Sequence, residues 1–521
     1  MVGNVLSRVL GLAREQLASG LFGTGDPIAA FTVADNVNSL LFNLMVSGIL
    51  EAALIPVLAQ WAAPDHAARA ELRRIAGALL TLVLLVVGVV ACLGVVFAPT
   101  VVHVMTALDG PQSDHGAATV ALTVSLVRWI LPALALLSAG TVLMATLYAI
   151  GRVAAPALAP AARNAVIVVA MVALTGSLGV KSLAAGVVIG GGLIVALQLG
   201  PLWRAGALPR PNLGFRHPAV RNVLALYVPI ALGLLVNTAA VVVDRNLAWG
   251  AGENALGAMR YATTLTQLVL GLVAAAISLA ALPTLSRHHA AGDEDAFRAT
   301  LGRALAMVTV LIVPATLGLA AVGKPAVELL FHHGATTAAG AHAILVALLG
   351  YLPGTLCAAY DQVLIFAFYA RRNTRTPVLV GVAAVGVYLA IALSLVQPFG
   401  MLGLVFANSA QWVAHAIIMY LLARRAFDFA AGPALRRVVA TSAGAAAGMA
   451  LLVLALWLGL AASWPAPAAT LPQLARELAL VALPVGAGAS FYLAALHLLG
   501  VEEIAALRRA LLGRFLPRLA G

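Results

Sequence analysis

Long apolar stretches, interrupted by short polar segments, recur from one end of the chain to the other. Ile75–Phe97, Val378–Val396 and Val438–Leu460 contain no charged side chain, and each is long enough as a helix to cross about 30 Å of hydrocarbon. The pattern predicts fourteen membrane-spanning helices, centred near residues 12, 46, 87, 133, 167, 193, 235, 271, 311, 353, 387, 413, 449 and 487. We therefore expect an all-α polytopic membrane protein.

Positive charge is concentrated in alternate loops. If the N-terminus lies in the cytoplasm, the segments on that side contain 22 of the 31 Lys and Arg residues, whereas the opposite loops contain Lys181, Lys324 and Arg476. Basic residues in short loops are retained on the cytoplasmic side of a membrane. The alternation predicts that both termini are cytoplasmic, and it supports fourteen spans because one missing span would reverse it.

Composition indicates the same class of protein. Of the 521 residues, 62% are hydrophobic and 10% are charged, a balance that cannot cover a soluble domain with polar groups. The net charge of +12 would suit nucleic acid only if Lys and Arg gathered on one soluble face. They do not, so we expect no nucleic-acid partner. Arg8, Arg14 and Glu15 interrupt the first apolar stretch, so we also expect no cleavable signal peptide.

The sequence offers no motif for a cofactor. Cys92 and Cys357 lie in apolar stretches, which favours packing over a disulfide or a zinc site. No G-x-x-x-x-G-K-[ST] motif is present, which argues against an ATP-driven pump. Gly190-Gly191-Gly192 is better explained by close helix packing than by phosphate binding. We expect neither an enzyme nor a cofactor, and we expect coupling to membrane potential or to a monovalent cation.

One set of residues occurs twice. Pro132, Tyr148, Ala149 and Pro156 recur 221 residues later as Pro353, Tyr369, Ala370 and Pro377. Each set describes a helix, a short basic loop and a helix that opens at proline. Because six spans separate the copies, the pattern predicts two lobes with the same orientation, related by a pseudo-two-fold axis along the membrane normal. We expect an N-lobe at 1–205, a C-lobe at 206–425, and two further spans with a basic cytoplasmic tail at 426–521.

Several motifs occur in an order and spacing that resemble those of a known family. They are Ser7–Arg14, Val243–Arg245, Tyr261-Ala262, Phe368–Ala370, Thr374–Pro377 and Asn408-Ser409. The chain resembles the MurJ/MviN family of lipid II flippases, which belongs to the MOP superfamily together with MATE exporters and polysaccharide flippases.

The resemblance implies a function as well as a fold. It implies a flippase of the bacterial inner membrane that carries a lipid-linked peptidoglycan precursor by alternating access. A cationic cavity in the first lobe would bind the diphosphate and sugars of this lipid-linked oligosaccharide, and a groove near the last two helices would hold the lipid tail. Membrane lipid and the cell-wall synthesis machinery are the partners it implies.

Charged residues within the predicted spans are the candidates for substrate binding. An arginine at the centre of a span costs about 2.5 to 3.5 kcal/mol on insertion scales, so it is expected to have a use, and a guanidinium forms paired hydrogen bonds with phosphate. Arg8 and Arg14 match family arginines, although Arg8 also lies close enough to the interface to snorkel. The full set of candidates is Arg8, Arg14, Arg260, Asp35 and Glu51.

The acidic candidates have two interpretations. Glu15, Asp35 and Glu51 would pair with the arginines while the cavity is empty, either to couple transport or only to stabilise the protein. Asp244, next to Arg245, forms either a local ion pair or, as the resemblance implies, part of a cation site.

Other positions were weighed for the same roles. Asn373, where the family usually has Asp, is the second candidate cation ligand, and Asp361 is a weaker one. Arg128 and Arg163 lie near the ends of predicted spans, where snorkelling to the interface is expected.

Three positions depart from the family pattern. Ala29, Phe42 and Thr264 stand where the family is typically charged, which leaves the substrate open, although Arg260 lies one helical turn before Thr264 and could replace the lost guanidinium. A MATE-like exporter of organic cations, a flippase for another lipid-linked polysaccharide and a non-transporting membrane scaffold are the alternatives.

Overall fold

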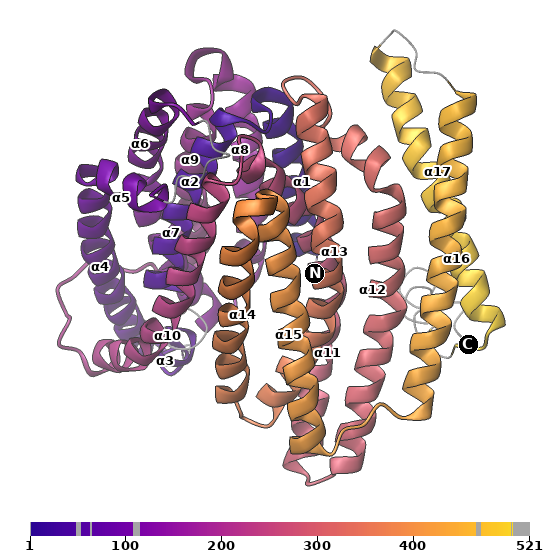
Figure 1. Ribbon diagram of the computed structural model, residues 1–521. Helices are drawn as coiled ribbons and strands as arrows, with labels where there is room; N and C mark the ends of the chain where they lie inside the picture. Colours follow the sequence, from indigo (N-terminus) through magenta and orange to yellow (C-terminus); the bar gives the residue numbers. More distant parts are fainter. Residues whose placement is uncertain are drawn as a thin grey trace. The chain divides into compact units, whose positions relative to one another are not determined.

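The computed structural model describes residues 2–47, 54–62, 65–107, 115–464, 470–501 and 503, and every regular element in this part of the chain is helical (Figure 1). Twelve segments are long and apolar enough to cross a membrane, and each contains one of the predicted centres. Two further long helices, α1 (Val2–Phe22) and α10 (Pro218–Trp249), contain the remaining two. The prediction of an all-α polytopic protein with about fourteen spans is confirmed.

The chain divides into two compact units, residues 1–257 with 334–336, and residues 258–333 with 337–521. Besides α1 and α10, the first unit contains α2 (Asp26–Phe42), the π-helix η1 (Asn43–Ser47), α3 (Ile55–Ala59), α4 (His66–Val96), α5 (Ala98–Met105), α6 (Ala117–Ile130), α7 (Pro132–Ala149), α8 (Ala154–Leu178) and α9 (Lys181–Arg204). The predicted lobe boundaries at 205 and 425 stay predictions.

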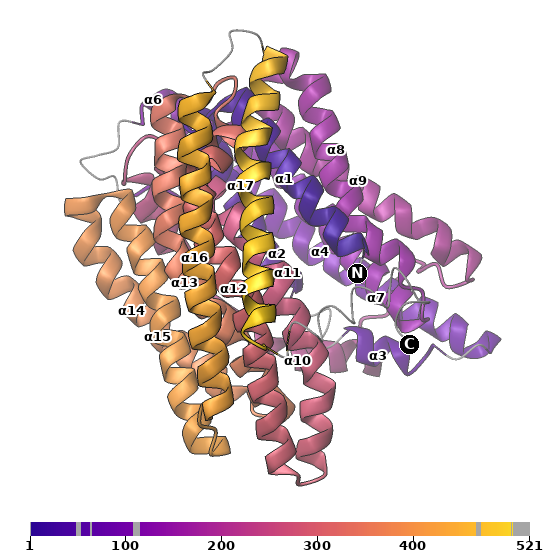
Figure 2. The ribbon, with the colours of Figure 1, turned by 90° about the vertical axis from the view of Figure 1, so that its right-hand side faces the viewer.

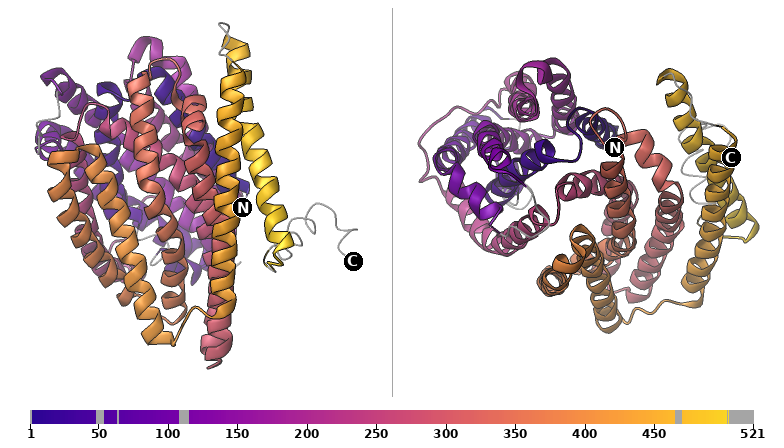
Figure 3. Two further views of the ribbon diagram at one scale, coloured as in Figure 1. Left: turned by 45° about the vertical axis from the view of Figure 1, so that its right-hand side comes forward. Right: turned by 45° about the horizontal axis from the view of Figure 1, so that its top comes forward.

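The second unit contains longer helices. They are α11 (Ala255–Ala290), which begins at the end of the first unit, α12 (Glu294–Phe331), α13 (Ala338–Ala370), α14 (Arg375–Phe399), α15 (Met401–Phe427), α16 (Pro433–Ser463) and α17 (Thr470–Leu498). Within this unit α13 packs against α12 and α15, α14 packs against α15, and α12 contacts α16 and α17. Figures 2 and 3 show α16 and α17 running side by side.

Helix α8 lies at the centre of the packing that positions the polar residues of the first unit. It packs against α1 on one side and against α9 on another, and α9 in turn packs against α7. A Cβ atom at Gly190 of α9 would lie 3.0 Å from Cγ of Arg163 on α8, and one at Gly191 would lie 3.1 Å from Cβ of Leu136 on α7. These two glycines therefore allow the close helix packing that the sequence predicts.

The internal repeat is visible in the positions of the helices. The segment Ala117–Ala149, formed by α6 and α7, recurs 221 residues later as α13, and both ends of α8 recur at the same offset as the ends of α14. The two copies differ at their first proline. Pro132 opens α7 after a break from α6, whereas Pro353 lies inside the continuous helix α13.

Backbone conformation repeats at the same offset. Gly179 and Gly400, which follow α8 and α14, both have φ of 54°. Gly151 (φ 75°) corresponds to Arg372 (φ 58°) in the loop before the repeated helix. Glycine adopts this left-handed region without steric cost, whereas a residue with a Cβ atom does not. The second copy therefore keeps a turn that favours glycine although it has arginine there.

Replacing Arg372 by glycine should stabilise the folded protein by about 1 kcal/mol, because it removes the steric cost of the left-handed conformation. The reciprocal change Gly151→Arg should destabilise it by a similar amount, since a Cβ atom there meets no described neighbour within 4 Å and only the backbone is affected. Thermal unfolding in detergent measures both. Identical unfolding midpoints for Arg372→Gly and the unmodified protein would contradict the prediction.

Candidate substrate site

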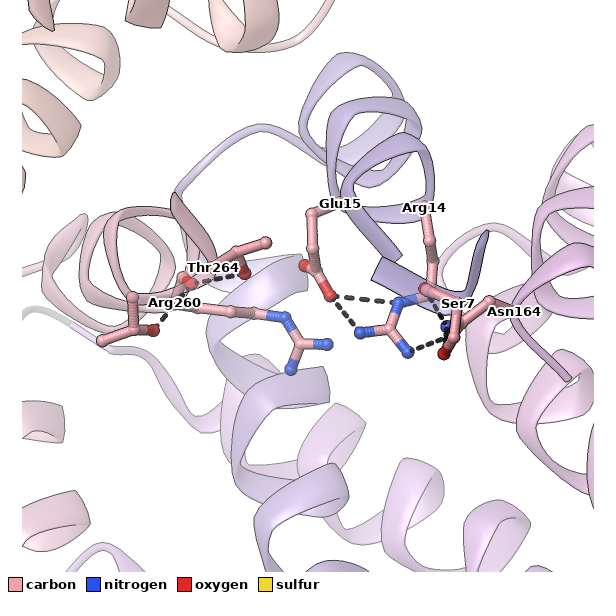
Figure 4. Close-up of polar contacts among 7 residues, drawn as sticks. Ser7, Arg14, Glu15, Asn164, Arg260 and Thr264 are labelled. Atoms are coloured by element: carbon pink, nitrogen blue, oxygen red, sulfur yellow. Dashed lines mark hydrogen bonds and ion pairs between the residues drawn. The ribbon is translucent and has the colours of Figure 1, made fainter. Parts of the chain in front are cut away.

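The guanidinium of Arg14 forms the centre of a polar cluster between α1 and α8 (Figure 4). Its Nε and Nη2 atoms donate to Oε1 of Glu15 at 3.1 and 2.6 Å, and Nη1 donates to Oδ1 of Asn164 at 3.1 Å. The amide of Asn164 donates in turn to the backbone oxygen of Ser7 at 3.0 Å. All three guanidinium nitrogens thus have an acceptor, which fixes the plane of the group.

Exposure differs between the two charged partners. The side chain of Arg14 is 23% exposed, whereas that of Glu15 is 3% exposed. The carboxylate neutralises the guanidinium within the bundle, and the exposed part of Arg14 remains able to contact a ligand. The prediction that an acidic residue pairs with the arginines of the first span is confirmed for Glu15.

A second arginine lies near this cluster. Arg163, on α8, interacts electrostatically with Asp35 of α2 and with Arg14, and its side chain packs over Gly190. Its Nε atom is buried without a hydrogen-bond partner among the described residues. We interpreted Arg163 from the sequence as a snorkelling residue near the end of a span. The structure instead places it well inside α8, within electrostatic range of Asp35 and Arg14.

Sequence reasoning also missed Asn164. Arg163 and Asn164 are adjacent polar residues in an apolar stretch of α8, and this pair was the available signal. The contact of Asn164 with Arg14 joins residues 150 positions apart, so neither spacing nor periodicity could reveal it.

The other substrate-binding candidates are placed as follows. Arg8 is partly exposed in the first half of α1, so the alternative of snorkelling stays open. Asp35 lies in α2 and acts on Arg163. Glu51 lies outside the described residues. Arg260 belongs to α11 in the second unit, and its role stays a prediction.

The structure shows what surrounds the three residues that depart from the family pattern. Ala29 is fully buried in α2, where a carboxylate would require a partner. Phe42 ends α2 and packs against a small apolar cluster that includes Val46 and Leu134. The Oγ1 atom of Thr264 donates to the backbone oxygen of Arg260 at 3.1 Å (Figure 4). None of these side chains brings a charge.

The candidate cation ligands form local contacts. Arg245 Nε lies 3.5 Å from Oδ2 of Asp244, which confirms the local ion pair. The amide nitrogen of Asn373 donates to the hydroxyl of Thr376 at 2.9 Å, and its oxygen accepts from the backbone N–H of Thr376 at 3.1 Å. Asn373 therefore accepts a hydrogen bond from a backbone N–H group in the first turn of α14. Cation binding by Asp244 and Asn373 stays a prediction.

An apolar groove lies among α12, α16 and α17 in the second unit. Its volume is about 400 Å³. Tyr492 contributes the polar atom, and its hydroxyl donates to the backbone oxygen of Val310 at 2.9 Å. The groove is lined by Val269, Val310, Leu311, Pro314, Ala315, Gly318, Leu319, Val322, Met449, Val453, Val485, Ala489, Tyr492 and Leu493. Such a lining suits hydrocarbon rather than a charged headgroup.

The fold and the polar cluster define a class of protein, a polytopic helical membrane transporter, in which charged side chains are held inside the bundle and an apolar groove lies on the last helices. Comparison with known families is consistent with this class. The model of the family described as lipid II flippase MurJ matches residues 18–472. The chain belongs to the MurJ family.

Relatives support this assignment over the full length. The chain is 29% identical over 514 residues to a probable lipid II flippase MurJ of Vibrio cholerae, covering 96% of this chain and 94% of the relative. It is 28% identical over 515 residues to the lipid II flippase MurJ of Burkholderia cenocepacia, covering 97% of each.

Solved structures show the same fold. A lipid II flippase MurJ in an inward closed conformation superposes with a TM-score of 0.74 at 17% identity, over 95% of this chain and 97% of that one. An inward-facing multidrug resistance MATE transporter of the MOP superfamily gives 0.65 at 15% identity, over 83% and 96%.

Replacing Asn164 by leucine should destabilise the folded protein by about 1 to 3 kcal/mol, because Arg14 loses an acceptor and the backbone oxygen of Ser7 loses a donor inside the bundle. The matched control is Val169→Leu on the same helix, whose side chain is 65% exposed and which should leave stability unchanged. Thermal unfolding in detergent distinguishes the two. Equal unfolding midpoints for both variants would show that the contact contributes nothing to stability.

Proposed function

We propose that the chain is a flippase that moves lipid II, the undecaprenyl-diphosphate-linked peptidoglycan precursor, from the cytoplasmic to the outer leaflet by alternating access. Membership of the MurJ family supports this proposal. The structural observation that carries it is Arg14, a partly exposed guanidinium held inside the bundle by Glu15 and Asn164.

The cluster offers a means of binding and releasing a diphosphate. A guanidinium binds phosphate oxygens with the same fork of donors that it uses for a carboxylate. A diphosphate would therefore compete with Glu15 for Arg14, while Asn164 continues to orient the group. When the diphosphate leaves, Glu15 restores the ion pair, so Arg14 is never left uncompensated in the bundle.

The lipid tail requires different surroundings from the headgroup. The groove among α12, α16 and α17 is lined by apolar side chains. These side chains would surround the hydrocarbon chain much as the lipid of the bilayer does. Separate sites for the tail and the headgroup suit a substrate with a long apolar chain and a charged head.

We further propose where the protein acts and what drives it. The basic segments support a bacterial inner membrane location with both termini in the cytoplasm. Membrane potential is a suitable driving force, since one charge crossing 100 mV gains about 2.3 kcal/mol, and a monovalent cation is the other candidate. The cell-wall synthesis machinery, which would consume the product, is the proposed protein partner.

Complementation of a flippase-depleted bacterium tests the function. The unmodified chain should restore growth, and Arg14→Ala should fail at equal membrane abundance, because lost charge-assisted hydrogen bonds to phosphate correspond to at least a tenfold loss of binding. Arg14→Lys should rescue partly, since it retains the charge but not the fork of donors.

The matched control for this experiment is Arg128→Ala. Arg128 is exposed, and among the described residues its side chain donates to the backbone oxygen of Val95 at 3.3 Å, so this variant should restore growth fully. Failure of the well-expressed unmodified chain would instead support a non-transporting scaffold. Normal rescue by Arg14→Ala, together with export of organic cations, would favour the MATE-like alternative.

Filling the groove should impair transport without altering the arginines. Ala489→Phe places a ring in the groove, whereas Ala487→Phe adds the same ring to an exposed position of α17 outside the groove lining. We expect at least a tenfold slower flipping of a long-chain lipid-linked substrate in proteoliposomes for Ala489→Phe alone. Equal rates for the two variants would rule out the groove as the site of the tail.

A further inference from the structure

Helices α13 and α15 approach each other closely within the second unit. A Cβ atom at Gly350 would lie 2.5 Å from Cγ1 of Val405, and one at Gly354 would lie 2.7 Å from Cα of Ser409. The hydroxyl of Ser409 donates to the backbone oxygen of Gly350 at 2.5 Å and accepts from the N–H of Gly354 at 3.2 Å. Two glycines four residues apart thus form a tight parallel seam.

An acidic residue and a histidine meet farther along the same seam. Asp361 of α13 and His415 of α15 are in contact, with Nδ1 of the histidine 2.7 Å from Oδ1 of the carboxylate. The side chain of Asp361 is 0% exposed, and that of His415 is 8% exposed. The second carboxylate oxygen, Oδ2, is buried and has no hydrogen-bond partner among the described residues.

The titratable groups around the pair do not compensate its charge. Cys357 and Tyr369 on α13 are close enough to interact with the Asp361 carboxylate, but neither supplies a positive charge. The hydroxyl of Tyr360 donates instead to Thr309 on α12 at 3.0 Å. Helix α14 presents Gly381 to Nε2 of His415. Within the described part of the chain, His415 is the group that acts on Asp361 as a possible positive charge, through the contact described above.

The net charge of the Asp361–His415 pair depends on one proton. An ionised Asp361 beside a neutral His415 leaves one negative charge buried in the seam, which is costly in a medium of low polarity. One added proton makes the pair neutral, whether it resides on the carboxyl group or on the imidazole. The proton therefore belongs to the contact between the two groups rather than to one of them.

We propose that Asp361 and His415 form a proton-binding site between α13 and α15. A metal cation suits this place less well, because hard cations require several oxygen ligands and the pair offers one carboxylate and an imidazole nitrogen. A proton requires only the two groups already in contact. Neither residue belongs to the substrate cluster around Arg14 or to the apolar groove.

A change in the protonation of this site would affect the packing of α13 against α15. Loss of the proton places a net charge between two helices that are in close contact at Gly350 and Gly354, so deprotonation favours a movement of the helices or the entry of water. Use of this proton to drive transport rests on the proposed flippase function. Proton binding itself does not.

Infrared difference spectroscopy of the full-length protein in lipid nanodiscs, between acidic and alkaline buffer, tests proton binding without any substrate. A pH-dependent signal, either the carbonyl stretch of a protonated Asp361 or the ring bands of a protonated His415, should be present in the unmodified protein and should be lost or shifted in Asp361→Asn. It should persist in Asp295→Asn, whose carboxylate is 94% exposed. In His415→Gln the signal should remain with a changed midpoint, because the partner that shares the proton is gone.

Two spectroscopic results would overturn the site. One is an Asp361→Asn spectrum identical to that of the unmodified protein, and the other is a titration that His415→Gln leaves unchanged. Because asparagine preserves the shape of the side chain, a folded variant is expected, and its thermal unfolding midpoint verifies this.

Coupling to transport is measured separately in proteoliposomes with an imposed pH gradient. Lipid flipping by the unmodified protein should respond to the gradient, and flipping by Asp361→Asn should lose that response. An unchanged response in Asp361→Asn would overturn coupling through this pair. If the unmodified protein flips no lipid at all, the proposed function fails, whereas the spectroscopic result on proton binding is unaffected.

Discussion

The cost of placing ionised side chains within membrane-spanning helices determines how this protein is built. A guanidinium in a span is tolerated only if protein groups replace the water it loses. For Arg14 these groups are the carboxylate of Glu15 and the amide oxygen of Asn164, one on its own helix and one on α8. The same contacts that make the charge tolerable also fix its direction, so stability and binding geometry have one cause.

Other ionisable groups follow the same rule within their own units. Arg163 lies near Asp35, and Asp361 contacts His415. Large apolar side chains are exposed on the same helices, as at Val172 on α8 and Leu379 on α14, where lipid is the expected neighbour. The distribution of pairs therefore separates the functional interior of each unit from its lipid-facing surface.

The helices could be predicted from the sequence, but most of their contacts could not. Apolar length locates a span along the chain, and the recurrence of Pro156 as Pro377 revealed a repeat whose helix ends coincide at the same offset. The pairing of Arg14 with Glu15 followed because the two residues are neighbours. Arg163 and Asn164 were missed because a one-dimensional pattern does not specify which helix packs against which side of α8. The contacts of Asn373 with Thr376 could not be predicted either, and cation binding by Asn373 stays a prediction.

The first unit holds guanidinium groups within its bundle although Ala29 and Phe42 bring no charge. Ala29 is fully buried and Phe42 packs against an apolar cluster, so a charge restored at either position would require a partner. Arg163 provides a second guanidinium beside Arg14, and Asp35 offsets its charge. Under the proposed function, a guanidinium on α8 would act on a diphosphate from its position in the folded unit and would contribute positive charge that α2 lacks. The positions that the helices give to these groups would then determine substrate binding, rather than each family position separately.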